Sequence, residues 1–173
     1  RWEIEAVGAK AGTRVSQLAS PSFDGFLKDA FVPLCAGGIV CAPEERSIVL
    51  DGRRLADWLD IEQIEILHCV PSVFRSSLNE GMNNRYFEAM RCVVLAGETL
   101  YTADVKRWME IFDERIRLAN LYGPTETTIL KTYHFVKPQD VDRPSIPIGK
   151  PIKGAAVMIV DHQGQPCGIG DVG

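Results

Sequence analysis

Short apolar, β-branched runs alternate with segments of helical spacing along most of the chain, and this alternation constrains the fold more than any other feature. Strand-like runs stand at residues 14–18, 39–42, 65–70, 92–96 and 116–121. Segments in which apolar residues recur at helical spacing lie between them, at 23–34, 53–59, 72–78 and around 106–111. Such alternation predicts an α/β fold with a mostly parallel, helix-covered sheet.

From about residue 144 the pattern changes. Prolines and glycines recur every few residues between 147 and 170 and separate short strand-like runs, such as the one at 156–160. Residues 161–164 have the composition of a hairpin turn. We therefore predict two parts: an α/β part at 1–143, and a β-rich segment at 144–173 that begins a small β-barrel-like element.

The composition narrows the expected partners and compartment. The 173 residues carry a net charge of −4, which does not favour binding to nucleic acids or anionic lipid surfaces. No apolar run approaches the ~20 residues that a membrane-spanning helix needs. The five cysteines are odd in number and have no close pair spacing, so neither a disulfide framework nor a zinc site is expected. These features predict a cytoplasmic protein that binds neither nucleic acid nor membrane.

Four candidate site residues fall at or just past the ends of predicted strands. They are Asp24, His68, Gly97 and Tyr122. In parallel sheets covered by helices, ligands bind at the carboxyl ends of the strands. We therefore expect these four residues to line one site.

The segment Asn120–Thr128 has residue types that suit a nucleotide. A Gly-Pro pair forces a tight turn after a strand and exposes backbone N–H groups to an anion. Hydroxyls beside the Glu126 carboxylate can hold phosphate oxygens and Mg²⁺ together, and Tyr122 can stack on a base. A simpler alternative remains open, in which Thr125 merely caps the next helical turn.

Asn120–Thr128 resembles a core signature of the adenylate-forming (ANL) superfamily, in the version typical of nonribosomal peptide synthetase adenylation domains. Leu18–Asp24 is similar to the family's Phe-Asp motif. Leu95–Leu100 is similar to its Gly-Gly-Glu-x-Leu segment, with Ala96 in place of the first Gly. The stretches 148–152 and 166–173 resemble the approach to the next family motif, so the resemblance extends over essentially the whole chain.

This resemblance implies a fold and a reaction. The α/β part would belong to the large N-terminal domain of the superfamily. The reaction would use ATP and Mg²⁺ to convert an amino acid into an aminoacyl-AMP, which is then loaded onto the phosphopantetheine thiol of a peptidyl carrier protein. Neighbouring synthetase domains would be further partners.

The resemblance also assigns roles to residues. Thr125 and Glu126 would be catalytic, with Thr125 binding the phosphates and Glu126 holding Mg²⁺. Tyr122 would stack on adenine and Asn120 would bind its amino edge, against a wall that includes Gly97 and Glu98. The full set implied for the nucleotide is Gly97, Glu98, Thr99, Asn120, Tyr122, Gly123 and Thr125.

Asp24 matches the position whose carboxylate pairs with the α-ammonium group of the substrate. Its alternative role is to cap the helix that follows. The other positions matching the substrate pocket are Gly25, Lys28, His68, Val94, Ala96, Leu121, Ile129 and Leu130. Because Lys28 and His68 are basic, they predict a polar or acidic substrate side chain. The alternatives are a solvated lysine and a histidine satisfied within the fold.

Several parts of the family pattern are not in this sequence. The Gly/Ser/Thr-rich phosphate loop, the ribose-binding Asp and the C-terminal catalytic Lys are missing, so we expect a fragment with weak nucleotide binding and no turnover on its own. Two other functions stay open. One is a different adenylate-forming enzyme, such as an acyl- or aryl-CoA ligase, and the other is a degenerate, non-catalytic α/β interaction module.

Overall fold

The computed structural model describes residues 1–172, which form one sheet in the strand order β2-β1-β3-β4-β5-β6-β7. The strands are β1 (Arg14–Ser16), β2 (Ile39–Cys41), β3 (Ile66–Cys69), β4 (Cys92–Leu95), β5 (Arg117–Tyr122), β6 (Thr132–Phe135) and β7 (Lys150–Pro151). Strands β1 to β5 pair with one another in parallel, whereas the β5–β6 and β6–β7 pairs are antiparallel. The predicted mostly parallel sheet is therefore confirmed.

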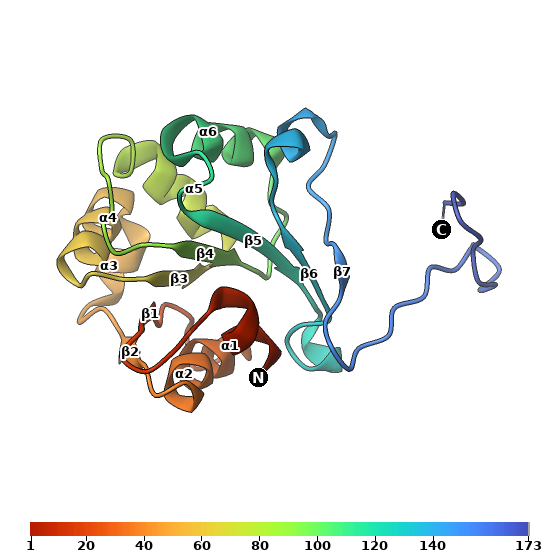
Figure 1. The fold of residues 1–173 in the computed structure, drawn as a ribbon, viewed down its shortest axis with the longest axis horizontal. Helices are drawn as coiled ribbons and strands as arrows, with labels where there is room; N and C mark the ends of the chain where they lie inside the picture. The colour runs from red at the N-terminus through yellow and green to blue at the C-terminus, as the bar shows by residue number, and fades with distance from the viewer. Residues whose placement is uncertain (173) are drawn as a thin grey trace.

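Helices cover both faces of this sheet. They are α1 (Trp2–Val7), α2 (Gly25–Cys35), α3 (Arg46–Leu50), α4 (Gly52–Ile61), α5 (Pro71–Glu80) and α6 (Thr102–Phe112), with 3₁₀ turns η1 (Thr125–Thr127) and η2 (Pro138–Asp142). Helices α4, α5 and α6 lie on one side of the sheet, and α1 and α2 on the other (Figure 1). None of the helices in residues 1–172 has the length and apolar character that crossing a bilayer requires.

Local sequence signals explain where two of these helices begin. Asp51 precedes α4, and its carboxylate accepts hydrogen bonds from the backbone N–H groups of Arg53 and Arg54, both at 3.0 Å. Helix α5 begins with Pro71, whose missing N–H is not needed at the first helical position. The two helices pack against each other, so their start points also fix the loops that lead into them from the sheet.

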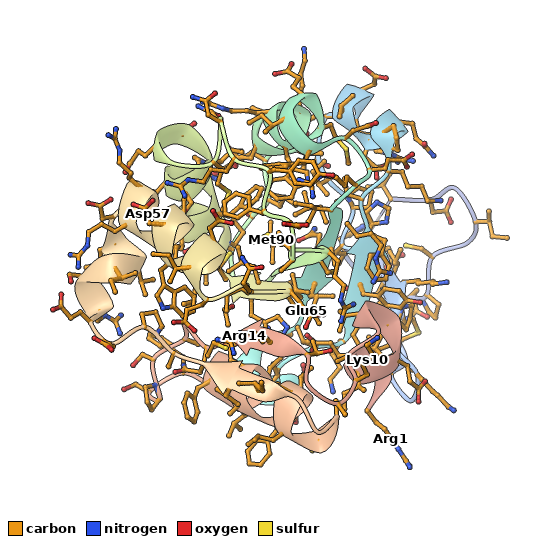
Figure 2. All side chains as sticks on the ribbon, turned by 60° about the vertical axis from the view of Figure 1, so that its left-hand side comes forward. Arg1, Lys10, Arg14, Asp57, Glu65 and Met90 are labelled. Carbon is orange, nitrogen blue, oxygen red and sulfur yellow. The ribbon has the colours of Figure 1, made fainter. Side chains whose placement is uncertain are left out.

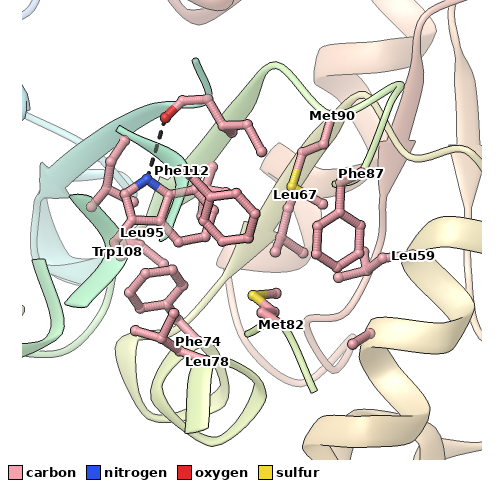
Figure 3. Packing of buried hydrophobic residues seen from close by; sticks show 14 of the residues in the cluster. Leu59, Leu67, Phe74, Leu78, Met82, Phe87, Met90, Leu95, Trp108 and Phe112 are labelled. Atoms are coloured by element: carbon pink, nitrogen blue, oxygen red, sulfur yellow. Dashed lines mark hydrogen bonds between the residues drawn. The ribbon is translucent and has the colours of Figure 1, made fainter. Parts of the chain in front are cut away.

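The two-residue period of the strands divides the core into two layers. Leu67 and Leu95 belong to the larger cluster, beneath helices α4 to α6, which contains the fully buried Trp108 (Figure 3). Ile66 and Val94, one residue away on the same strands, belong to the second cluster on the face of α1 and α2. Both faces of the sheet are thus buried, as expected for parallel strands.

Charged side chains gather at the edge of the sheet where the parallel strands begin. Figure 2 shows Arg14 and Glu65 close together, and the backbone N–H of Arg14 donates to Glu65 Oε1 at 3.1 Å. Glu65 also pairs with Arg91 Nε at 3.2 Å. These contacts tie together the starts of β1, β3 and β4 and help to fix their register.

The segment predicted to be β-rich, 144–173, forms little regular structure within the described residues. Strand β7 pairs with β6, so the main sheet extends past the predicted division at residue 143, and that division stays a prediction. The predicted strand-like run at 156–160 is wrong, since residues 152–172 hold only a bridge between Val160 and Pro166 (Figure 1). A strand needs partners for its N–H and C=O groups along its length, and within residues 1–172 this run has only that bridge and a hydrogen bond from the Cys167 N–H to the Ile159 carbonyl oxygen at 2.9 Å.

Candidate functional site

The parallel strands bring several loops to one edge of the sheet. Cys69 pairs with Leu95 and Leu95 with Asn120, so the segments that follow β3, β4 and β5 leave the sheet side by side. The segment that follows β1 and leads to Asp24 leaves at the same edge. The candidate residues on these loops therefore share the carboxyl edge, where ligands of such sheets bind.

Six of the seven residues predicted to contact a nucleotide line one open cleft of about 430 Å³. They are Gly97, Glu98, Thr99, Asn120, Tyr122 and Gly123. The cleft lies within the size range of small-molecule sites. Tyr122 is 49% exposed, so part of its ring is open to a ligand. Thr125, the seventh residue, lies beyond this lining in η1.

Sequence reasoning missed the opposite wall of the cleft, which is formed by Ser145, Ile146 and Ile148. The side-chain amide of Asn120 donates to the carbonyl oxygen of Pro147 at 2.9 Å, which holds that wall against β5. This contact also commits one N–H of Asn120 to the protein and leaves its amide oxygen available. The family-like stretch at 148–152 indicated that this part of the chain is relevant. Only the antiparallel pairing of β6 and β7 with the sheet brings residues 145–148 to the cleft.

Glu98 has a structural role in addition to its place in the cleft. Its carboxylate accepts hydrogen bonds from the backbone N–H of Ser72 at 2.8 Å and from the Ser72 hydroxyl at 2.9 Å, at the start of α5. Gly97 beside it has φ +91°, in the left-handed region that favours glycine. The loop after β4 is thus fixed to α5 next to the cleft.

The loop after β5 folds back tightly on itself. The backbone N–H of Lys131 donates to the carbonyl oxygen of Tyr122 at 2.8 Å. A Cβ at Gly123 would lie 2.5 Å from the carbonyl oxygen of Ile129, so only glycine fits there. Thr128 and Ile129 have φ values of 74° and 62°, which are unfavourable for such residues. The tip of this loop, residues 123–129, therefore has one defined shape that is held by close contacts.

Thr125 and Glu126 are exposed at this tip. Pro124 occupies the position before the turn, and the Thr125 side chain makes no capping hydrogen bond, so the capping alternative for Thr125 is not observed. Glu126 takes part in no hydrogen bond or ion pair with the described residues 1–172. Both side chains can therefore reach a ligand without breaking a contact within the fold.

Asp24 precedes α2 and is half-buried. It stands at the N-cap position, but its side chain makes no capping hydrogen bond, so the structural alternative for this residue is also not observed. Its carboxylate has no ion-pair partner among residues 1–172. A half-buried carboxylate without a partner is suited to a cationic ligand group.

Two smaller hollows bring together most of the predicted substrate residues. The first, of about 100 Å³, is lined among others by Gly25, Lys28 and Ala96. The second, of about 340 Å³, is lined among others by Lys28, Ile129 and Leu130. Lys28 therefore joins the two. Val94 and Leu121 are buried in the core cluster on this face of the sheet and line neither hollow.

His68 is enclosed between two carboxylates that sequence reasoning missed. Its Nδ1 lies 3.2 Å from Asp29 Oδ1, and its Nε2 lies 3.1 Å from Glu3 Oε1. Both contacts have ion-pair length without the alignment of an ideal hydrogen bond. Lys28 Nζ lies 3.2 Å from the same Asp29 oxygen. All four side chains are at most 8% exposed.

The electrostatics of this cluster keep both carboxylates ionised. Burial by itself raises the pKa of Asp29, but the charge of Lys28 and the contact with His68 outweigh it and lower the pKa to about 2. The same opposing causes, burial against Lys28 and His68, leave the pKa of Glu3 below its ordinary value. The cluster therefore contains two negative charges at neutral pH.

These charges bear on the substrate preference expected from Lys28 and His68, which stays a prediction. A preference for a polar or acidic side chain requires positive charge that is free to meet the substrate, and here each basic group already faces a carboxylate of this chain. His68 is 1% exposed and lines neither hollow, and it lies between two carboxylates of the fold although neither ring nitrogen has a well-aligned hydrogen bond. The solvated-lysine alternative is not observed, because Lys28 is buried against Asp29.

Comparison with known proteins identifies related sequences. Residues 2–173 match the family described as AMP-binding enzyme. Gramicidin S synthase 2 of Aneurinibacillus migulanus is 32% identical over 171 residues, covering 98% of this chain and 4% of that protein. The L-proline--[L-prolyl-carrier protein] ligase of Streptomyces coelicolor is 32% identical over 160 residues, covering 89% of this chain and 30% of that protein. The chain thus spans only a small part of the curated relatives it matches.

Solved structures agree in fold. An NRPS protein containing adenylation and PCP domains, bound to a vinylsulfonamide inhibitor, matches with a TM-score of 0.82 and 26% identity, over 94% of this chain and 28% of that one. A Vibrio cholerae adenylation domain in complex with glycyl-adenosine-5'-phosphate also matches with a TM-score of 0.82. It is 24% identical, over 95% of this chain and 30% of that one, so this match supports a shared fold only. By its sequence and its fold, the chain belongs to the AMP-binding enzyme family, among the adenylation domains of nonribosomal peptide synthetases.

Proposed function

We propose that the carboxyl edge of this sheet activates an amino acid as an aminoacyl-AMP, which is then transferred to the phosphopantetheine thiol of a peptidyl carrier protein. The supporting observation is the cleft that gathers the predicted nucleotide residues, at the same edge of the sheet as the loops carrying Glu126 and Asp24. The names of the relatives support the partner, since one ligates proline to a carrier protein and another contains adenylation and PCP domains.

The proposed chemistry has two displacement steps. A carboxylate oxygen of the amino acid attacks the α-phosphorus of ATP, a new P–O bond forms, and the bond to the pyrophosphate oxygen breaks. The carrier thiol then attacks the activated carbonyl carbon and AMP leaves. In such displacements the protein contributes positioning and charge neutralisation more than covalent chemistry.

The nucleotide would occupy the open cleft. The exposed ring of Tyr122 would stack on the adenine, while the free amide oxygen of Asn120 would accept from its amino group. The backbone from Gly97 to Thr99 would form the wall beside the base. Thr125, with its uncommitted hydroxyl, would bind a phosphate oxygen.

The residues at the tip fit a magnesium ion that is shared with a nucleotide. Mg²⁺ binds through one or two carboxylates together with phosphate oxygens and water. Glu126 is exposed and has no partner in residues 1–172, and no group of three or more His, Cys, Asp or Glu side chains there is arranged as a self-sufficient metal site. Bound at Glu126, the ion would supply charge neutralisation at the phosphates.

The substrate amine would pair with Asp24. This carboxylate is half-buried, has no partner in residues 1–172 and stands beside Gly25, which lines the smaller hollow. An α-ammonium group satisfies such a carboxylate through charge-assisted hydrogen bonds. This pairing favours an amino acid over a carboxylic acid without an amine.

The proposal is tested by amino-acid-dependent ATP–pyrophosphate exchange in the full-length protein that carries this chain. We expect exchange with at least one amino acid, and none with the matching carboxylic acids that lack the amine. Glu126→Gln should lower the rate by about 100-fold, since it removes an ionised metal ligand. Glu114→Gln, at another exposed glutamate, is the matched control and should leave the rate unchanged.

Two results would overturn the proposal. Exchange supported equally by carboxylic acids without an amine would favour an acyl- or aryl-CoA ligase. Absence of exchange with every amino acid, together with no Mg²⁺-dependent ATP binding, would favour a non-catalytic module.

A further inference from the structure

Asp29 is the buried carboxylate at which several elements of the candidate site meet. It lies on α2, five residues after Asp24, and its side chain is 4% exposed. Its Oδ2 accepts hydrogen bonds from the backbone N–H groups of Leu18 at 3.2 Å and Ala19 at 3.1 Å. Its Oδ1 faces Lys28 and the histidine of β3. One side chain thus contacts the loop after β1, its own helix and the sheet.

The loop from Leu18 to Asp24 has few other anchors. Its remaining hydrogen bonds are local, such as the one from the Phe23 N–H to the Ser20 carbonyl oxygen at 2.9 Å. The two backbone N–H groups bound by Asp29 are therefore its principal polar attachment to the body of the fold. If they were released, the direction in which Asp24 presents its carboxylate would be less well defined.

The other end of the attachment is rigid. The backbone N–H of His68 donates to the Ser16 hydroxyl at 2.8 Å, and that hydroxyl donates to the His68 carbonyl oxygen at 3.2 Å. Beyond its contact with Asp29, the imidazole also faces Glu3 of α1 at 3.1 Å. Asp29 therefore connects the loop 18–24 to the centre of the sheet and, through His68, to a second helix.

The charges keep this connection in place. A buried carboxylate is retained in ionised form only if cations or several donors compensate it. Lys28, His68 and two backbone N–H groups surround Asp29, and an asparagine could not replace it, because its NH₂ group would face another donor. The connection therefore requires a carboxylate and not merely a polar side chain.

We propose that Asp29 is a positioning residue of the amino-acid site, which fixes the segment 18–24 and thereby the carboxylate of Asp24. The consequence for catalysis rests on the proposed function, in which Asp24 binds the substrate amine. The anchoring of the loop does not rest on it. Small displacements of a binding group are costly, so the loss of this anchor should weaken amino-acid binding more than nucleotide binding.

The test is Asp29→Asn in the full-length protein, with two measurements. Hydrogen exchange of the peptide covering residues 17–27 should become faster. The KM for the amino acid in pyrophosphate exchange should rise by about tenfold or more, while the KM for ATP stays within about threefold. Asp29→Glu keeps the carboxylate, so its hydrogen exchange and its amino-acid KM should lie between those of wild type and Asp29→Asn.

Asp140→Asn is the matched control, because Asp140 is also a buried aspartate paired with a histidine. It should leave the exchange of residues 17–27 and the amino-acid KM unchanged. Unchanged hydrogen exchange in Asp29→Asn, or a change no larger than in Asp140→Asn, would overturn the positioning role. If wild-type protein shows no amino-acid-dependent activity, the proposed function fails, and hydrogen exchange still decides the role of Asp29.

His68→Gln provides a second test if the Asp29→Asn protein does not fold. If Asp29→Asn is insoluble, His68→Gln is measured in the same way, since it weakens the link from Asp29 to the sheet. We then expect a smaller acceleration of hydrogen exchange in residues 17–27 and a rise of about threefold in the amino-acid KM. No change in either quantity would contradict the inference.

Discussion

Two buried aspartates of this protein have similar partners, but they connect different numbers of structural elements. Asp29 is 3% exposed and Asp140 is 1% exposed, and each is paired with a histidine and a basic side chain. Asp140 lies 2.6 Å from His134 Nε2 and 2.9 Å from Arg143 Nε, and it accepts a hydrogen bond from the backbone N–H of Lys137 at 2.8 Å. In both cases contacts with cations and donors lower the pKa of the carboxyl against the opposing effect of burial.

The difference lies in where the partners come from. Those of Asp140 are within six residues in the chain, so they secure one local turn, η2. Those of Asp29 include the histidine of β3 and the loop after β1, so they hold separate elements together. The partner cations differ too, since the side chain of Arg143 is 53% exposed and that of Lys28 only 8%. Water can therefore replace a lost contact at Asp140 more easily than at Asp29.

The largest expected effect is on stability when each carboxylate is removed. Asp29→Ala should lower the free energy of unfolding by about 3 to 5 kcal/mol, because it leaves Lys28 buried without its partner. Asp140→Ala should cost about 1 to 2 kcal/mol, since the cation there is solvated. Urea unfolding of the full-length variants measures both values, and equal losses would remove the distinction between the two clusters.

The next largest effect is the decrease of the free energy of unfolding at acidic pH. The folded-state pKa of Asp29 is lowered from 3.8 to about 2, so its contribution is fully present above the unfolded pKa and is lost as the pH falls from about 4 through 2. The shift corresponds to about 2 kcal/mol. Urea unfolding at pH 6, 4 and 2.5 should show this loss in wild type and a flatter profile in Asp29→Asn. If the free energy of unfolding depended on pH equally in wild type and in Asp29→Asn, the conclusion that Asp29 is ionised and charge-compensated in the folded state would be contradicted.

The smallest expected effect concerns the exposed cation. Arg143→Met should change the free energy of unfolding by only about 0.5 kcal/mol, because an exposed ion pair contributes little. Lys28→Met should cost more, since it removes a buried charge that compensates Asp29. Thermal unfolding of the two full-length variants compares them directly. A greater loss from Arg143→Met would reverse the order on which the comparison depends.

The same contrast explains what could be predicted of the fold. Local periodicity predicts β4 at 92–96, and the structure has it at Cys92–Leu95, because each strand and helix carries its own pattern. The antiparallel strand β6 pairs with β5, the strand just before it in the chain, and the sequence did not indicate this pairing. The run at 156–160 has the composition of a strand, but within residues 1–172 its pairing is limited to a single bridge at Val160. Pattern alone therefore predicts elements better than pairing.

The candidate site divides in the same way. The residues of the cleft could be predicted as neighbours, since Gly97 lies just after β4 and Tyr122 ends the adjacent parallel strand β5. Glu3 and Asp29 could not, because nothing local to either residue indicates a histidine on β3. The one available signal was an aspartate on the inward face of α2 among apolar residues, which is unusual unless it is paired. Charge compensation between distant elements is thus the property that sequence reasoning missed.

Asp24 and the cleft lined by Tyr122 are proposed to bind two ends of one ligand. A crystal structure of the full-length protein with a non-hydrolysable aminoacyl-adenylate analogue tests it most directly. We predict the adenine against Tyr122 and Gly97, and the ammonium nitrogen about 3 Å from a carboxylate oxygen of Asp24. A ligand bound with its amine far from Asp24, or with its adenine outside this cleft, would contradict the account.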